Sequence, residues 1–127
     1  MKRALLVLLT ACLLPCMSGC FPLLIGAAAG GLGAYAVSND TVEGDSDKNF
    51  DMLWDSALAT ARRYGNVDTE NISTGHIEVS FESSKLWIRL VRLTRATTRV
   101  RVSARKHHFP DIKLAQDVFV KIISGVK

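Results

Sequence analysis

Hydrophobic and polar residues change their spacing along this chain. Residues 4–37 carry no charge, and polar and apolar residues mix only from Ser38 onward. Between residues 50 and 64 apolar side chains recur every three or four positions, which predicts an amphipathic helix. From residue 76 to residue 105 apolar and polar side chains alternate over several stretches, which predicts half-buried strands. The pattern therefore divides the chain into an apolar N-terminal part and a folded domain.

The predicted helix carries signals for its start and its end. Asp47 is a suitable N-cap and Gly65 a suitable stop, and Arg62 and Arg63 suit the negative end of the helix dipole. We expect Trp54 to lie in the core rather than to serve as a ligand platform. The apolar face comprises Phe50, Leu53, Trp54, Ala57, Leu58, Ala61 and Tyr64.

Extended stretches are predicted on both sides of this helix. Val42 lies in a short one at residues 40–44, and four more follow the helix, at residues 66–73, 76–82, 85–90 and 99–105. A last helix begins near Asp111, with Pro110 close to its start. Its apolar face comprises Ile112, Ala115, Phe119, Ile122 and Ile123.

Ser83 and Ser84 are candidates for a two-residue turn between two of these strands. Such a turn pairs Phe81 with Leu86 on the core face and sets Glu78 opposite Arg89 on the other face. Both faces then agree in one register, which supports a hairpin.

The order of the predicted elements is β-α-β-β-β-β-α. An antiparallel sheet of four to five strands with both helices packed on one face buries every apolar stripe in that order. The sequence therefore predicts an α+β fold over residues 39–127.

Residues 1–19 have the anatomy of a bacterial lipoprotein signal peptide. Lys2 and Arg3 precede an apolar stretch, and the leader ends in Met17-Ser18-Gly19-Cys20, which resembles a lipobox with Met17 in place of the usual leucine. Cys12 and Cys16 compete, but Cys12 leaves too short an apolar stretch and Cys16 follows a proline. Cys20 is therefore the predicted lipidation site, where acyl chains such as palmitate are attached.

Residues 20–38 contain the lipidated cysteine and an apolar, Gly/Ala-rich tether. Gly26 and Gly30 form a G-x-x-x-G pair, a spacing that lets helices pack closely in membranes. Three interpretations stay open: a flexible tether at the membrane surface, a short inserted helix, or a segment that packs on the folded domain.

The cysteine positions and the charge exclude several classes. No cysteine follows Cys20, which excludes a disulfide-stapled fold and a zinc site built on cysteine. Cleavage before Cys20 removes Lys2 and Arg3 and lowers the net charge from +4 to +2. The basic balance is therefore no nucleic-acid footprint, and we expect no nucleic-acid partner.

Charge is segregated along the folded domain. Residues 39–82 carry ten acids and three bases, a balance of −7, whereas residues 83–127 carry eleven bases and two acids, a balance of +9. Arg99, Arg101 and Arg105 share one side of a predicted strand. They form either a solvated, edge-protecting sheet face or a patch for anionic lipid head groups or an acidic envelope partner.

Catalytic and metal-binding patterns are weak. His107, His108 and Asp111 are the best candidates for metal ligands, but neighbouring side chains on a strand point apart and no further ligand cluster is visible. No Gly-x-Ser-x-Gly elbow supports a serine triad, and there is no P-loop. We therefore predict no catalytic residue, no metal and no cofactor.

The chain resembles a family of small, uncharacterised bacterial lipoproteins of unknown function. The resemblance runs from Cys20 to the C-terminus. It rests on that cysteine, the Gly/Ala-rich stretch, Leu53-Trp54-Asp55-Ser56-Ala57-Leu58, Gly65, Ser73-Thr74-Gly75-His76-Ile77-Glu78 and Val100-Arg101-Val102. It departs at Arg105-Lys106-His107-His108, where acidic or glycine residues often lead into the last helix. The resemblance implies an envelope location and carries over no catalytic residue.

These patterns predict a membrane-anchored envelope lipoprotein that serves as a structural or interaction module and not as an enzyme. The alternative is an envelope enzyme or binding protein that acts on a cell-wall or lipid substrate. Phe21 stands where an aspartate would retain a lipoprotein in the inner membrane. In a host with two membranes we therefore expect the outer membrane, facing the periplasm.

Overall fold

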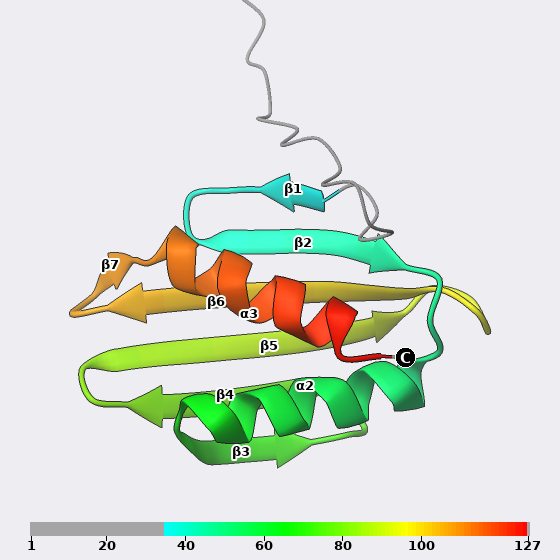
Figure 1. Ribbon diagram of the computed structural model, residues 1–127, viewed down its shortest axis with the longest axis horizontal. Coiled ribbons are helices and arrows are strands. Elements are labelled where there is room, and N and C mark those ends of the chain that lie inside the picture. The colour runs from blue at the N-terminus through cyan, green and yellow to red at the C-terminus, as the bar shows by residue number, and fades with distance from the viewer. Residues whose placement is uncertain (1–34, 127) are drawn as a thin grey trace, which may run out of the picture.

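A computed structural model describes residues 35–126, which form a seven-stranded sheet and two helices within that range (Figure 1). Predictions that concern residues 1–34, Cys20 included, lie outside this range. The elements are β1 (Tyr35–Val37), β2 (Thr41–Ser46), α2 (Phe50–Tyr64), β3 (Asn66–Asn71), β4 (His76–Phe81), β5 (Ser84–Arg92), β6 (Thr98–Lys106), β7 (Phe109–Pro110) and α3 (Ile112–Ser124).

The sheet is antiparallel in every pairing, with strand order β1-β2-β6-β5-β4-β3, and β7 pairs with the end of β6. Strands β3 to β6 form a meander, and the N-terminal β2 pairs with the last long strand, β6. The predicted α+β class, the antiparallel sheet and the two helices on one face are confirmed. The predicted count of four to five strands was too low, because β1 and β7 have only three and two residues.

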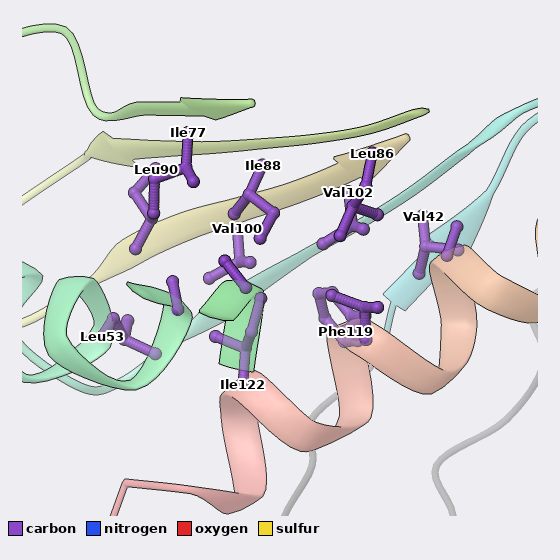
Figure 2. Packing of buried hydrophobic residues seen from close by; sticks show 14 of the residues in the cluster. Val42, Leu53, Ile77, Leu86, Ile88, Leu90, Val100, Val102, Phe119 and Ile122 are labelled. Atoms are coloured by element: carbon purple, nitrogen blue, oxygen red, sulfur yellow. The ribbon is translucent and has the colours of Figure 1, made fainter. Parts of the chain in front are cut away.

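Both helices cover the same face of the sheet (Figure 1). Helix α3 lies over β2 and β6, whereas α2 lies over β3, β4 and β5. Figure 2 shows side chains of the sheet, such as Ile88 and Val102, pointing toward Phe119 and Ile122 of α3 and Leu53 of α2. The alternating apolar positions of β4, β5 and β6 supply much of this core: Ile77, Val79, Leu86, Ile88, Leu90, Val100, Val102 and Ala104 are each at most 2% exposed.

Helix α2 begins two residues later than the sequence suggested. The N-cap is Asn49, whose side-chain oxygen accepts a hydrogen bond from the backbone N–H of Met52, and Asp47 is exposed before it. The predicted end at Gly65 is confirmed. Gly65 is extended, and a Cβ there would lie 2.6 Å from the carbonyl oxygen of Ser80. Close approach to β4 therefore requires a glycine at this position.

The β4–β5 hairpin has a different register from the predicted one. Phe81 pairs with Ser84, and Glu82 and Ser83 form the turn in place of Ser83 and Ser84. Glu78 therefore lies opposite Trp87, and Arg89 lies opposite His76. A slip of two residues keeps every side chain on its predicted face, so the pattern of faces could not distinguish the two registers.

The sheet begins inside the segment that the sequence assigned to the tether. Tyr35–Val37 pairs with β2, and the side chain of Val37 packs against the core. An apolar run next to a Gly/Ala-rich stretch gave no period-two signal for so short a strand. At least the last three residues of that run therefore belong to the folded domain.

Candidate functional site

One face of the sheet is uncovered by any described element, because both helices lie on the opposite face. We call this the open face. It carries the side chains that alternate with the core positions: Thr41, Glu43 and Asp45 of β2; Arg99, Arg101, Ser103 and Arg105 of β6; Lys85, Trp87, Arg89 and Val91 of β5; and His76, Glu78 and Ser80 of β4. The only large aromatic side chain among these is the half-buried Trp87.

The three predicted arginines lie together on this face, and each faces a carboxylate. Arg99 binds Asp45 through two hydrogen bonds, with Nε–Oδ1 at 2.6 Å and Nη2–Oδ2 at 3.0 Å. Arg101 binds Glu43, which lies directly opposite it in the β2–β6 register. The arginines are therefore compensated, pair by pair, by acids of the N-terminal segment.

The third pair lies at the end of β6. Arg105 donates from Nη2 to Oδ2 of Asp40 at 2.6 Å. This hydrogen bond holds the pKa of the Asp40 carboxyl below its usual range, and the hydrogen bond from Arg99 does the same for Asp45. Each of the three arginines therefore has a carboxylate partner in the fold, and a role of Arg99, Arg101 and Arg105 toward an anionic partner stays a prediction.

A hollow of about 350 Å³ lies at one end of the open face. Trp87, Lys85 and Arg105 line it from β5 and β6, and Ser80 lines it from β4. The remaining wall comes from two turns and consists of Glu82, Ser83, His107 and His108. The hollow therefore combines an aromatic ring, two cations, two imidazoles and one carboxylate.

Two hairpin turns meet at this hollow. Glu82 and Ser83 join β4 to β5, and His107 and His108 join β6 to β7. The backbone N–H of His107 donates to the carbonyl of Ser83 at 3.1 Å, which ties one turn to the other. The hollow is therefore built by the relative placement of two tight turns and not by a flexible loop.

The backbone of both turns is strained. Glu82, His107 and His108 have φ values of 49°, 48° and 73°, and these are the three non-glycine residues with positive φ in the described range 35–126. Side chains with a Cβ disfavour this region. A two-residue turn with positive φ at both residues, as at His107 and His108, normally selects Asn-Gly. All three strained residues line the same hollow.

A polar cluster on the helix side links the C-terminal end of α2 to the middle and the last turn of α3. Tyr64 donates to the carboxylate of Asp117, and Lys121 Nζ donates to the Tyr64 hydroxyl at 2.7 Å and to Asp117 at 2.9 Å. Burial, followed by the hydrogen bond to Asp117, raises the pKa of Tyr64. The hydrogen bond from Tyr64 lowers the pKa of Asp117. The cluster lies on the surface where two helices meet, so we assign it a structural role.

The three candidate metal ligands have structural positions at the β6–β7 turn and at the start of α3. Asp111 caps α3, since its Oδ1 accepts from the backbone N–H of Leu114 at 3.1 Å, while His107 and His108 occupy the turn. Within residues 35–126, no three side chains of His, Cys, Asp or Glu gather closely enough to hold a metal ion. Over the same range neither helix has the length and apolar character needed to cross a bilayer.

The alternation predicted for residues 85–90 puts Trp87 on the face opposite Leu86, but it does not identify the hollow. The alternation of β5 gives the face, whereas the hollow depends on two turns whose positions the sequence did not predict. His-His is not a sequence that signals a hairpin turn, so the β6–β7 turn was missed. Because neither His107 nor His108 is a glycine, the residues before Phe109-Pro110 did not predict a turn.

Comparison with known families gives one match. The family model described as "Protein of unknown function (DUF3568)" matches residues 2–122. No curated protein and no solved structure matches the chain.

Proposed function

Because this chain belongs to the DUF3568 family of proteins of unknown function, we propose from its own residues that it is a membrane-anchored bacterial envelope lipoprotein. The observation that carries the proposal is the Ser18-Gly19-Cys20 lipobox at the end of a signal-like leader. The family match begins at residue 2, so the leader belongs to the matched pattern together with the folded domain. The lipobox itself supports an exported chain with its lipid on Cys20.

The short spacing between anchor and sheet limits where the domain acts. Only residues 21–34 separate Cys20 from Tyr35, the first residue of β1. A chain spans at most about 3.5 Å per residue, so the sheet begins within about 50 Å of the acylated cysteine. A partner of this domain is therefore on, or close to, the membrane that holds the anchor.

We propose that the domain is an interaction module and not an enzyme. A buried core closed by two helices, together with a sheet face that no described element covers, supports this function. The open face presents paired charges and Trp87. Compensated arginines favour an envelope protein or another directional ligand over an anionic lipid surface, which responds to net charge.

We place the protein at the outer membrane, facing the periplasm, if the host has two membranes. Phe21 after the acylated cysteine supports this location, because it is not the aspartate associated with retention in the inner membrane. Phe21→Asp should move the protein to the inner-membrane fraction on a density gradient. An unchanged distribution would contradict the assignment.

Metabolic labelling with radioactive palmitate tests the anchor. The wild-type chain should incorporate label and sediment with membranes, and Cys20→Ala should lose both properties. Cys12→Ala and Cys16→Ala are matched controls, because they remove a thiol from the same leader and should keep the label on the product. Label retained in Cys20→Ala, or lost in either control, would overturn the assignment.

The alternative function, a binding protein or enzyme for a cell-wall or lipid substrate, is favoured by one observation, the hollow beside Trp87. Binding without turnover would leave the interaction-module proposal in place. Chemical conversion of a bound compound would show that the domain is an enzyme and would contradict the interaction-module proposal.

A further inference from the structure

The hollow between the two turns has the composition of a ligand site rather than of a surface groove. Its volume of about 350 Å³ is near the lower end of the roughly 300–1,000 Å³ typical of small-molecule sites. That size suits a monosaccharide or disaccharide better than a long peptide. The hollow is therefore large enough to hold a small ligand.

Each chemical group in the hollow restricts the ligand. Trp87 offers an aromatic ring, on which the C–H face of a sugar ring packs well. Glu82 accepts hydrogen bonds and donates none when ionised, so it suits the hydroxyl groups of such a ring. It also disfavours a ligand with many negative charges.

The cations require an anionic group on the same ligand. Lys85 is only weakly engaged, because its nearest carboxylate oxygen, on Glu78, lies 3.5 Å away. Arg105 uses Nε and Nη2 on Asp40, which leaves Nη1 for another acceptor. The imidazoles of His107 and His108 have no side-chain hydrogen bond within residues 35–126, although both line the hollow.

The strained backbone of the turns indicates that these side chains have a role in ligand binding. Positive φ is costly for residues other than glycine, and such residues cluster at functional sites. In the described range all three non-glycine examples, Glu82, His107 and His108, line this one hollow. Asn-Gly would form this turn at lower cost than His-His. The two histidines therefore indicate a role for their side chains in binding.

We propose that the hollow binds a saccharide carrying one carboxylate group, with its ring on Trp87, its hydroxyl groups on Glu82 and its carboxylate among Lys85, His107 and His108. The site lies within the folded domain and does not involve Cys20. Loss of sugar binding and loss of palmitate labelling are therefore separate results.

Titration of the full chain in detergent with glucuronic acid, glucose and inorganic phosphate tests the proposal. The readout is the shift of the Trp87 indole N–H resonance in an NMR spectrum, assigned with Trp87→Phe. Glucuronic acid should bind with a dissociation constant of about 1 mM or tighter, and glucose and phosphate should each bind at least about tenfold more weakly. Equal binding of glucose, equal binding of phosphate, or no shift with glucuronic acid would each overturn the proposal.

Variants locate the binding groups, with affinities measured by titration calorimetry because that readout does not depend on the indole. Trp87→Thr, which keeps a strand-forming residue, should abolish binding, and Lys85→Gln should weaken it about tenfold. Lys113→Gln removes the same charge from an exposed position on α3 and should leave the affinity unchanged.

The double variant His107→Asn with His108→Gly suits the turn and should fold well, yet bind about tenfold more weakly. Wild-type affinity in Trp87→Thr or in this double variant would overturn the assignment.

Discussion

Glu43 of β2 lies directly opposite Arg101 of β6, and its carboxylate also lies 3.6 Å from Nε of Arg99. The two strands are far apart in sequence, since the Arg99–Asp45 pair spans 54 residues and the Arg101–Glu43 pair spans 58 residues. The acidic first half and the basic second half of the domain therefore meet along the β2–β6 pairing, and they meet again along β4–β5, where Lys85 lies near Glu78. Along β2 and β6, the segregation of charge in the sequence corresponds to strand pairing.

A double-mutant cycle on Glu43 and Arg101 measures this relationship. Glu43→Gln, Arg101→Gln and the double variant should show a coupling of about 0.2–1 kcal/mol in the free energy of unfolding, because both side chains are partly exposed. The coupling should shrink as salt is raised, and urea denaturation at low and high salt measures both effects. Coupling of zero at low salt would show that the pair adds no stability.

Acid should destabilise the domain through Asp40 and Asp45. Arginine hydrogen bonds lower the pKa of both carboxyls in the folded state. A lowered folded-state pKa gives stability that is present above the unfolded pKa of about 3.9 and is lost as pH falls through the folded value. The free energy of unfolding should therefore decrease below about pH 4.

The pH profile of Asp45→Asn provides the comparison. This variant lacks the carboxyl that Arg99 binds, so its stability should fall less as the pH is lowered through the acid range than that of the wild type. Asp47→Asn is a matched control, because Asp47 is an exposed acid in the loop just after β2. A control profile as flat as that of Asp45→Asn would contradict the role of the ion pair.

Trp54→Ala should destabilise the protein strongly. Trp54 is 4% exposed, belongs to the core cluster and stacks on Phe50 at 6.1 Å between ring centroids. Removing a buried aromatic side chain costs about 3–5 kcal/mol where the site cannot collapse, out of a total of about 5–15 kcal/mol. Denaturant midpoints check this, and an unchanged midpoint would contradict burial of the ring.

The faces of the strands were predictable from the sequence, and their partners were less so. Ile77, Ile88 and Val102 alternate with polar residues and are all fully buried, as period two requires. Pairing is a tertiary property, so neither the slip at Phe81–Ser84 nor the pairing of β2 with β6 follows from alternation. Trp87 could be placed on the outer face, but its hollow depends on two turns that only the fold brings together.

A fragment that begins at residue 39 should be less stable than one that begins at residue 35. The shorter fragment lacks β1, which exposes the edge of β2 and removes Val37 from the margin of the core. Burial of part of a valine side chain and three strand pairs suggest a loss of about 1–2 kcal/mol. Urea denaturation of both fragments measures it, and equal stability would show that β1 contributes nothing.

The double variant His107→Asn with His108→Gly should be more stable than the wild type. His107 and His108 have φ values of 48° and 73°, and their turn joins two strands through only two residues. Asn and Gly adopt such values at lower cost, so relief of strain should raise the free energy of unfolding by about 1–2 kcal/mol. Thermal and urea denaturation measure the change.

The reverse pair of residues, His107→Gly with His108→Asn, controls for loss of the imidazoles alone, and it should stabilise the turn less because Asn-Gly is the favoured order. A double variant that is less stable than the wild type would show that the imidazoles stabilise the turn, and it would remove the strain argument for a binding role.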